Sequence, residues 1–235
     1  MNQSTPLAGA DGCKTGWLCL LAESTNAPLT AFIAPTFQTL VDRLPQGGIL
    51  AVDIPIGIPD CGPRQCDIEA RRQLGPRRSS VFPAPIRAVL ESPSYEQACA
   101  TRQAIDGKRM SKQAFAITPK IREVDLVLRG GDVAGREVRE CHPEVSFALW
   151  AGAPLSFAKK KVEGRAERAA LIDAVWPGLR ENLRRTLPRG AYATDDLHDA
   201  FAALWTAARI CSGSALVLPA EPELDSAGLS MEIVA

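Results

Sequence analysis

Four aspartates of this chain have the residue type and the spacing to hold a metal ion. Asp11 ends the first apolar run of the sequence, and Asp53 ends the second. Asp196 and Asp199 lie at the start of an alanine-rich segment near the C-terminus. A carboxylate beside buried strands is costly unless it is paired or bound to a cation. Acids at the ends of separate apolar elements therefore predict a shared cation.

The expected chemistry is hydrolysis of phosphodiesters. Carboxylate oxygens suit Mg²⁺ or Mn²⁺, and two such ions roughly 4 Å apart would activate water and stabilise the leaving oxygen. We expect Asp11, Asp53 and Asp196 as the principal ligands, followed by Asp199, with Glu140 as a further catalytic acid. Without metal these carboxylates repel one another, so at least one should have a raised pKa.

The order of the predicted elements brings Asp11 and Asp53 to one edge of a sheet. Apolar runs over residues 6–11, 17–22 and 29–34 predict three meandering strands, followed by a helix that Thr36 caps. The continuous apolar run over 49–53 is typical of a strand buried on both faces, and we expect it beside the first strand. Residues 136–141 predict a fifth strand.

The last predicted helix, over residues 195–211, is apolar on more than one side. At about 100° per residue, Asp196 shares a face with alanines, and Asp199 lies at the border of that face. No charged residue follows Asp199 until Arg209, so we expect this helix to pack closely on the sheet. The alternative for the two acids is simple capping of the helix N-terminus.

The middle of the chain is basic, although the net charge is zero. Between residues 64 and 122 there are twelve Lys or Arg against five Asp or Glu. We interpret 1–235 as a single α/β domain in which 55–135 is an insertion or lid. The candidate phosphate ligands are Lys14, Arg71, Arg77, Arg78 and Lys120. For each arginine, a surface ion pair is the alternative.

Histidine and cysteine residues add two expectations. His198, next to Asp199, is a candidate for proton transfer, whereas we expect His142 to pack. The seven cysteines are scattered, and neither a secretion signal nor a bilayer-spanning apolar run is present. These features favour a cytoplasmic protein with reduced thiols and no membrane partner.

Several motifs resemble the domain of unknown function 429 family over residues 7–220, and that family is regarded as a predicted nuclease. The motifs are Gly9–Trp17, Val52–Pro59, Arg64–Asp67, Arg77–Pro85, Pro119–Asp125, Glu140–Glu144 and Thr194–Ala200. The resemblance implies a ribonuclease H-like fold, with a mixed five-stranded sheet flanked by helices and a large basic insertion after the fourth strand.

Holliday-junction resolvases of the RuvC type are more distantly similar. They place acids on the first and fourth strands and a D-x-x-D pair on the last helix, and Asp11, Asp53, Asp196 and Asp199 match those places. The resemblance thus implies a nuclease of DNA or RNA that uses Mg²⁺ or Mn²⁺. Glu140 or Glu144 would be an additional acid.

Two other functions fit the same fold. One is a non-catalytic module that binds nucleic acid or protein. The other is an actin-like phosphotransferase, in which the turn over residues 12–16 would hold phosphate. The second acidic motif, from Asp53 to Gly57, has proline and isoleucine where such an enzyme would need another phosphate turn.

Overall fold

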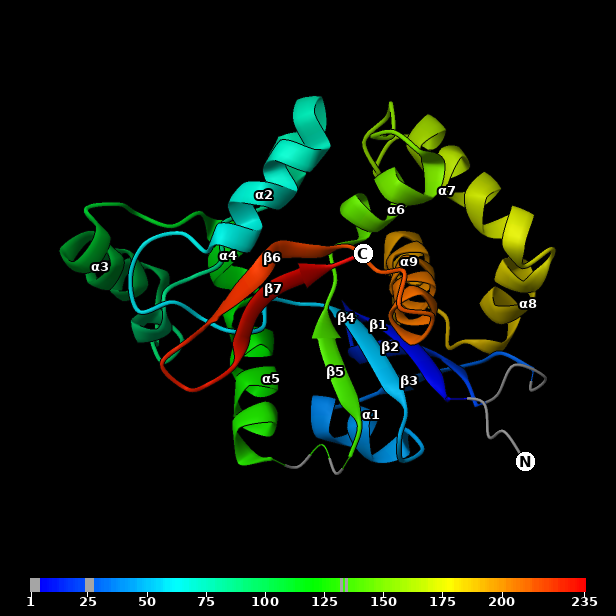
Figure 1. The fold of residues 1–235 in the computed structure, drawn as a ribbon, viewed down its shortest axis with the longest axis horizontal. Helices are drawn as coiled ribbons and strands as arrows, with labels where there is room; N and C mark the ends of the chain where they lie inside the picture. Colours follow the sequence, from blue (N-terminus) through cyan, green and yellow to red (C-terminus); the bar gives the residue numbers. More distant parts are fainter. Residues whose placement is uncertain (1–4, 24–27, 132, 134) are drawn as a thin grey trace.

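A five-stranded mixed sheet with helices on both faces organises the chain (Figure 1). The computed structural model describes residues 5–23, 28–131, 133 and 135–235. The elements of the first half are β1 (Leu7–Cys13), β2 (Gly16–Ala22), β3 (Thr30–Ala34), α1 (Phe37–Arg43), β4 (Ile49–Asp53), α2 (Gln65–Leu74) and the 3₁₀ helices η1 (Gly75–Ser80) and η2 (Arg87–Val89). The second half comprises α3 (Tyr95–Asp106), α4 (Lys112–Ala116), α5 (Thr118–Gly130), β5 (Glu137–Glu140), α6 (Pro143–Ala151), α7 (Val162–Val175), α8 (Leu179–Thr186), α9 (Thr194–Cys211), β6 (Val217–Leu224) and β7 (Ser230–Val234).

The strand order of the sheet is β3-β2-β1-β4-β5. The first three strands form an antiparallel meander, and β1, β4 and β5 are parallel. The predicted meander and the predicted place of the fourth strand beside the first are therefore confirmed. In the register of β1 and β4, Asp11 lies directly opposite Asp53.

Alternation along the strands decides which face each aspartate occupies. Ala8 and Ala10 of β1 point into the core beneath the sheet, where Phe37 of α1 and Ile121 of α5 also pack. Successive side chains of a strand point to opposite faces, so Gly9 and Asp11 face the other layer. The same alternation applies to β4, where Leu50 and Val52 face α1. Both aspartates thus point toward the face that α9 covers.

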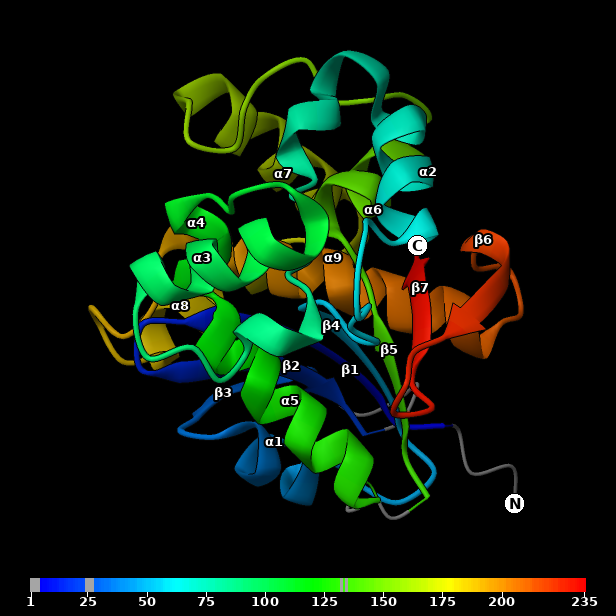
Figure 2. The same ribbon diagram turned by 90° about the vertical axis from the view of Figure 1, so that its left-hand side faces the viewer.

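Helix α9 crosses that face in close contact with β1 (Figure 2). A Cβ atom on Gly9 would lie 2.0 Å from the Leu204 nitrogen and 2.4 Å from the Ala200 oxygen. Ala203 and Ala207 pack on the same side of the helix against Ala51 of β4. The predicted close approach of an alanine face to the sheet is confirmed, because only small residues on both elements permit it.

Residues 55–135 do not form a single lid. Helix α5 packs with α1 beneath the sheet through Ile121 and Val124, so it belongs to the central core. By contrast, α3 and α4 build a separate small cluster around Cys99 and Met110. Only part of the predicted insertion therefore lies apart from the sheet.

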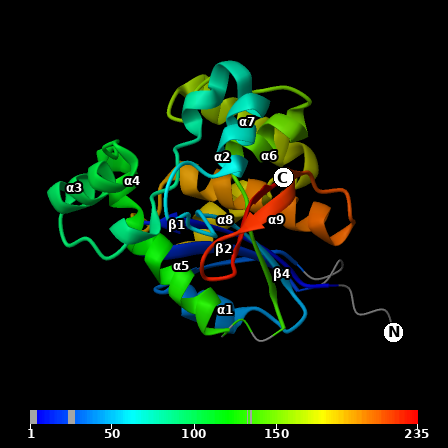
Figure 3. The same cartoon turned by 60° about the vertical axis from the view of Figure 1, so that its left-hand side comes forward.

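The C-terminal hairpin of β6 and β7 was not predicted, because β6 contains Pro219 and Pro222, which are unfavourable within a strand. Its second strand lies beside the end of β5, where Val234 pairs with Cys141 (Figure 3).

Helices α4 and α8 were also not predicted, because each is a short segment without a long helical repeat of apolar residues. In the part of the chain described above, no helix is long and apolar enough to cross a membrane.

Candidate metal centre

Three carboxylates meet where β1, β4 and α9 come together. Asp11, Asp53 and Asp199 each offer one oxygen, and these atoms all lie within 4.8 Å of one another. The parallel register supplies the first two side chains, and the passage of α9 over the sheet supplies the third. Oxygen ligands bind Mg²⁺ at about 2.0–2.1 Å, so two ligands of one ion lie at most about 4.2 Å apart, and small rotations of these side chains would let them share one ion. Within the described residues this is the one such group.

Burial makes ionisation of these acids unfavourable. Asp11 is 9% exposed and Asp199 is 1% exposed. Burial raises the pKa of Asp11 well above its ordinary value, and the charges of Asp53 and Asp199 raise it further. Burial likewise raises the pKa values of Asp53 and Asp199 to about 6, against the opposing charge of Lys159. At neutral pH the cluster therefore requires a compensating cation.

Lys159 supplies one such positive charge. Its Nζ donates to Asp199 Oδ2 at 2.6 Å from the segment between α6 and α7. Burial alone would lower the pKa of Lys159, but the charges of Asp199 and Asp53 hold it above its ordinary value. Lys159 was not among the predicted site residues, because it begins a run of three lysines of the kind that is usually exposed to solvent.

Asp196 has a different role from Asp199. Its Oδ2 accepts a hydrogen bond from the Ala193 backbone N–H at 2.8 Å, which caps the first turn of α9. The charge of Asp196 still raises the pKa values of Asp11 and Asp53, but its carboxylate lies outside the group of three. The structure thus brings Asp199, rather than Asp196, together with Asp11 and Asp53, and Asp196 caps the helix.

Glu140, which the sequence predicted as a further catalytic acid, is paired with a buried arginine. Arg64 donates to both of its oxygens, at 2.6 and 2.8 Å, and the Ile56 N–H donates at 2.6 Å. Arg64 also binds Asp67 at 2.6 Å. This network fixes the chain that follows Asp53, so Glu140 acts in positioning rather than as a metal ligand.

Glu144, at the start of α6, is the glutamate whose charge reaches the cluster. It raises the pKa values of both Asp53 and Asp199. Its carboxylate pairs with the buried Arg168 and lies 3.9 Å from Arg77. Of the two glutamates that the sequence offered, Glu144 is therefore the one electrostatically linked to the three aspartates.

The cluster opens into a cleft of about 530 Å³. Arg77 and Lys120 line it, as do Lys159 and Lys160. Lys120 donates to the Gly16 carbonyl at 2.6 Å and lies 4.4 Å from the centre of the Trp17 ring. Two of the five predicted phosphate ligands are thus placed at the cleft.

The other three predicted phosphate ligands lie outside the residues that line the cleft. Arg71 donates to the Val81 carbonyl at 2.6 Å, which fastens α2 to the chain after η1. Lys14 and Arg78 are exposed to solvent. The turn that carries Lys14 therefore does not form a phosphate cradle over Asp11.

Of the two histidines, the structure places His142 rather than His198 at the cleft. His142 lines the cleft, and its buried Nδ1 has no hydrogen-bond partner among the described residues. Burial lowers the pKa of His142. His198 instead faces α7 and α8, where burial and the charges of Arg180 and Arg168 lower its pKa to about 4. The geometry therefore favours His142, rather than His198, for proton transfer.

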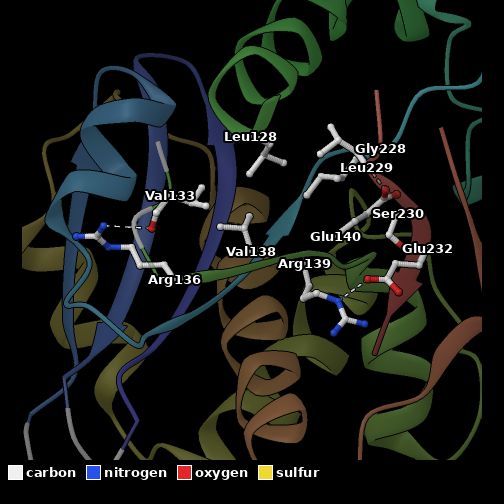
Figure 4. A pocket seen from close by; sticks show the side chains of 11 residues that line it. Leu128, Val133, Arg136, Val138, Arg139, Glu140, Gly228, Leu229, Ser230 and Glu232 are labelled. Atoms are coloured by element: carbon white, nitrogen blue, oxygen red, sulfur yellow. Dashed lines mark hydrogen bonds and ion pairs between the residues drawn. The ribbon is translucent and has the colours of Figure 1, made fainter. Parts of the chain in front are cut away.

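A second hollow, of about 280 Å³, lies between β5, α5 and the C-terminal hairpin (Figure 4). Arg139 pairs there with Glu232, and Arg136 donates to the Val133 carbonyl at 3.2 Å. Glu140 reaches this hollow too, but it is paired with Arg64. Because its charged groups already have partners, this hollow is a weaker candidate for chemistry than the acidic cleft.

Comparison with known proteins yields one family. The model of a family described as "Protein of unknown function (DUF429)" matches residues 9–224, which include the three aspartates and Lys159. No curated protein and no solved structure matches the chain.

Proposed function

The chain belongs to DUF429, a family of unknown function, and we propose that it is a divalent-metal-dependent nuclease. The observation that carries the proposal is the meeting of Asp11, Asp53 and Asp199, of which Asp11 and Asp53 line the cleft. Acids on the first strand, the fourth strand and the last long helix also support a ribonuclease H-like fold. The substrate would be a phosphodiester of DNA or RNA.

The donor set fits Mg²⁺ or Mn²⁺. All three ligand atoms are carboxylate oxygens, with no cysteine or histidine in the group, which argues against zinc. Asp11, Asp53 and Asp199 would hold the ion. When bound, it would polarise the phosphate and lower the pKa of its water.

The remaining residues of the cleft suit binding of the substrate and movement of protons. Arg77 and Lys120 can contact phosphate oxygens at the rim. In hydrolysis, a water oxygen bonds to phosphorus while the bond from phosphorus to the leaving sugar oxygen breaks. His142 is neutral at pH 7 because burial lowers its pKa, and it can take up the proton that the water loses. Lys159, in turn, can donate to an oxygen of the phosphate.

One observation favours a second function, a non-catalytic nucleic-acid-binding module. Lys159 already compensates part of the negative charge, so the three carboxylates can persist without an ion. The actin-like phosphotransferase gains no comparable support, because Lys14 is exposed and lies outside the lining of the cleft.

The deciding experiment is cleavage of labelled single-stranded, duplex, hybrid and branched nucleic acids with Mg²⁺, Mn²⁺ or EDTA. We expect metal-dependent cleavage by the wild type that falls to background in Asp53→Asn and Asp199→Asn. Asp196→Asn is the matched control, because this residue caps the helix, and it should retain cleavage. Equal cleavage by all variants would mean a contaminant. No cleavage, with Mn²⁺ binding confirmed, would favour the binding module.

The cellular compartment is part of the same proposal. None of the seven cysteines is in a disulfide. Reduced thiols support a reducing compartment, and we place the protein in the cytoplasm.

A further inference from the structure

We propose that an arginine-rich hollow beside the N-terminus of α9 binds the sugar–phosphate backbone of a single nucleic-acid strand. The hollow has a volume of about 450 Å³, and three arginines line it together with one acidic residue, Glu181, and with Tyr192 and Thr194: Arg184, Arg185 and Arg189. The inference rests on the proposed nuclease function and names the surface by which the substrate strand would be held next to the cleft.

The first argument is unbalanced charge. Arg180 is paired with Asp173 at 2.9 Å, and Glu181 binds both Arg180 at 2.7 Å and Arg184 at 3.3 Å. Arg185 and Arg189 are exposed, and neither has an acidic partner within 4.0 Å in the described ranges. Two arginines at the hollow therefore have unused guanidinium groups, whose geometry suits phosphate oxygens.

The middle of the chain, which the sequence marked as basic, offers fewer unpaired cations than its composition implies. Arg64 is buried against Glu140 and Asp67, and Arg87 pairs with Asp125 and Asp225. Arg102 pairs with Asp106, and Arg122 with Glu91. These four arginines of residues 64–122 are thus already paired within the fold.

The second argument is the aromatic residue in the hollow. Tyr192 is partly exposed. Partial burial raises the pKa of Tyr192, and the charge of Arg184 opposes this rise. Proteins that hold single strands combine arginines that follow the backbone with aromatic rings on which bases stack. An arginine patch for an acidic protein segment would not require an aromatic ring in this place.

The third argument is position. Thr194 begins α9, and Asp199 follows five residues later, which corresponds to about 7.5 Å along the helix axis at about 1.5 Å per residue. Thr15 donates to the Ala191 carbonyl at 3.3 Å, so the loop before α9 is fastened to the turn after Asp11. The hollow and the cleft therefore lie at the same end of the sheet. A strand with its scissile phosphate in the cleft would place neighbouring nucleotides at the hollow.

The experiment measures binding of a fluorescent single-stranded oligonucleotide by anisotropy, with the full chain in EDTA and over a range of salt concentrations. We expect Arg185→Gln/Arg189→Gln to bind about tenfold more weakly. The slope of log K against log salt should fall by roughly 1.4, since each single-strand phosphate contact contributes about 0.7. The matched control is Arg72→Gln/Arg109→Gln, two exposed arginines that have no ion pair among the described residues and lie outside the hollow, and it should bind as the wild type does.

The outcomes separate this inference from the proposed function. Equal binding by the Arg185→Gln/Arg189→Gln variant and its control would contradict the proposal that the hollow binds a nucleic-acid strand. The absence of any binding would contradict it as well. Displacement of the oligonucleotide by poly-glutamate at the same charge concentration would also overturn it, because the surface would then select charge alone. Arginine-dependent binding without metal-dependent cleavage of any substrate would support strand binding at the hollow and contradict the proposed nuclease activity.

Discussion

At the scale of single residues, the contact between Lys159 and Asp199 controls the charge of the metal-free site. The ammonium lies 2.6 Å from the carboxylate, close to where a divalent ion would be bound. A bound ion and Lys159 would therefore compete for the carboxylate of Asp199. The side chain of Lys159 is 39% exposed, so it has room to turn away when an ion enters.

We predict that Lys159→Met binds Mn²⁺ more tightly than the wild type. Removing the lysine frees the carboxylate and removes a repulsive charge. A hydrogen bond between charged groups contributes about 1.5 kcal/mol or more, so the gain should be on the order of tenfold in the dissociation constant, measured by calorimetry.

Lys160→Met is the matched control for Lys159→Met. Lys160 also lines the cleft, but it has no ion pair among the described residues. Its replacement should change the affinity much less. Unchanged or weaker Mn²⁺ binding in Lys159→Met would contradict the competition between lysine and metal.

At the scale of elements, the position of Asp199 depends on how closely α9 approaches β1. Gly9 sits at the crossing, where a Cβ atom would meet the backbone of α9 at 2.0 Å. Helix backbone cannot move aside without moving the whole helix. The contact between Gly9 and α9 therefore fixes the position of Asp199, although Gly9 is not one of the three acids.

We predict that Gly9→Ala both destabilises the fold and weakens Mn²⁺ binding. Overpacking a core contact typically costs about 1–3 kcal/mol, and displacement of α9 would carry Asp199 away from Asp11. Urea unfolding and Mn²⁺ titration of the same sample measure the two effects.

Gly12→Ala, in the same strand, is the control for Gly9→Ala. A Cβ atom there would meet only the Lys120 side chain, at 2.8 Å, and that flexible chain can move. A Gly9→Ala variant with the stability and metal affinity of the wild type would refute the role given to this crossing.

At the scale of the whole molecule, buried acids fall into two classes. Glu140, Asp67 and Asp125 are paired with arginines, so their charges are compensated within the fold. Burial nevertheless raises the pKa of Glu140 to about 7. Asp53 and Asp199 have no arginine partner in the described part of the chain, and burial raises their pKa values to about 6. Since the ordinary value is about 3.8, the folded metal-free protein holds protons there that the unfolded chain has lost. These two acids therefore reduce the free energy of unfolding as pH rises from about 4 to about 6.

We predict that stabilisation by Mn²⁺ grows with pH. Protons compete with the ion below pH 6, so saturating Mn²⁺ should raise the melting temperature little at pH 5 and markedly at pH 7.5. Thermal unfolding with and without Mn²⁺ at both values measures this. A larger stabilisation at pH 5 would contradict the assignment of these carboxylates as ligands.

In the metal-free protein, His198 has a pKa lowered to about 4, so it increases the free energy of unfolding as pH rises and opposes the effect of the two aspartates. The pH dependence of the wild type alone therefore does not isolate Asp53, and the Asp53→Asn variant provides the comparison. The variant lacks the titration of Asp53. Relative to the wild type, its stability should therefore improve as pH rises through 6.

The sequence by itself determined the framework of the site. Apolar alternation and the order of turns predicted β1, β4 and α9, and with them the meeting of Asp11 and Asp53. These features could be predicted because strand and helix periods are local, and because the carboxyl ends of parallel neighbouring strands share one edge.

Only the tertiary structure decided which charged side chains join the acidic cluster and which are paired elsewhere in the fold. Asp199 rather than Asp196 joins the cluster because α9 begins at Thr194 and turns Asp196 back onto its own backbone. Lys159 lies 40 residues from its partner Asp199, and Arg64 lies 76 residues from Glu140. No local pattern encodes such pairs, since packing of distant segments selects them. The physical reason is that hydrophobic periodicity acts within an element, whereas the pairing of a charge depends on whatever the completed fold brings beside it.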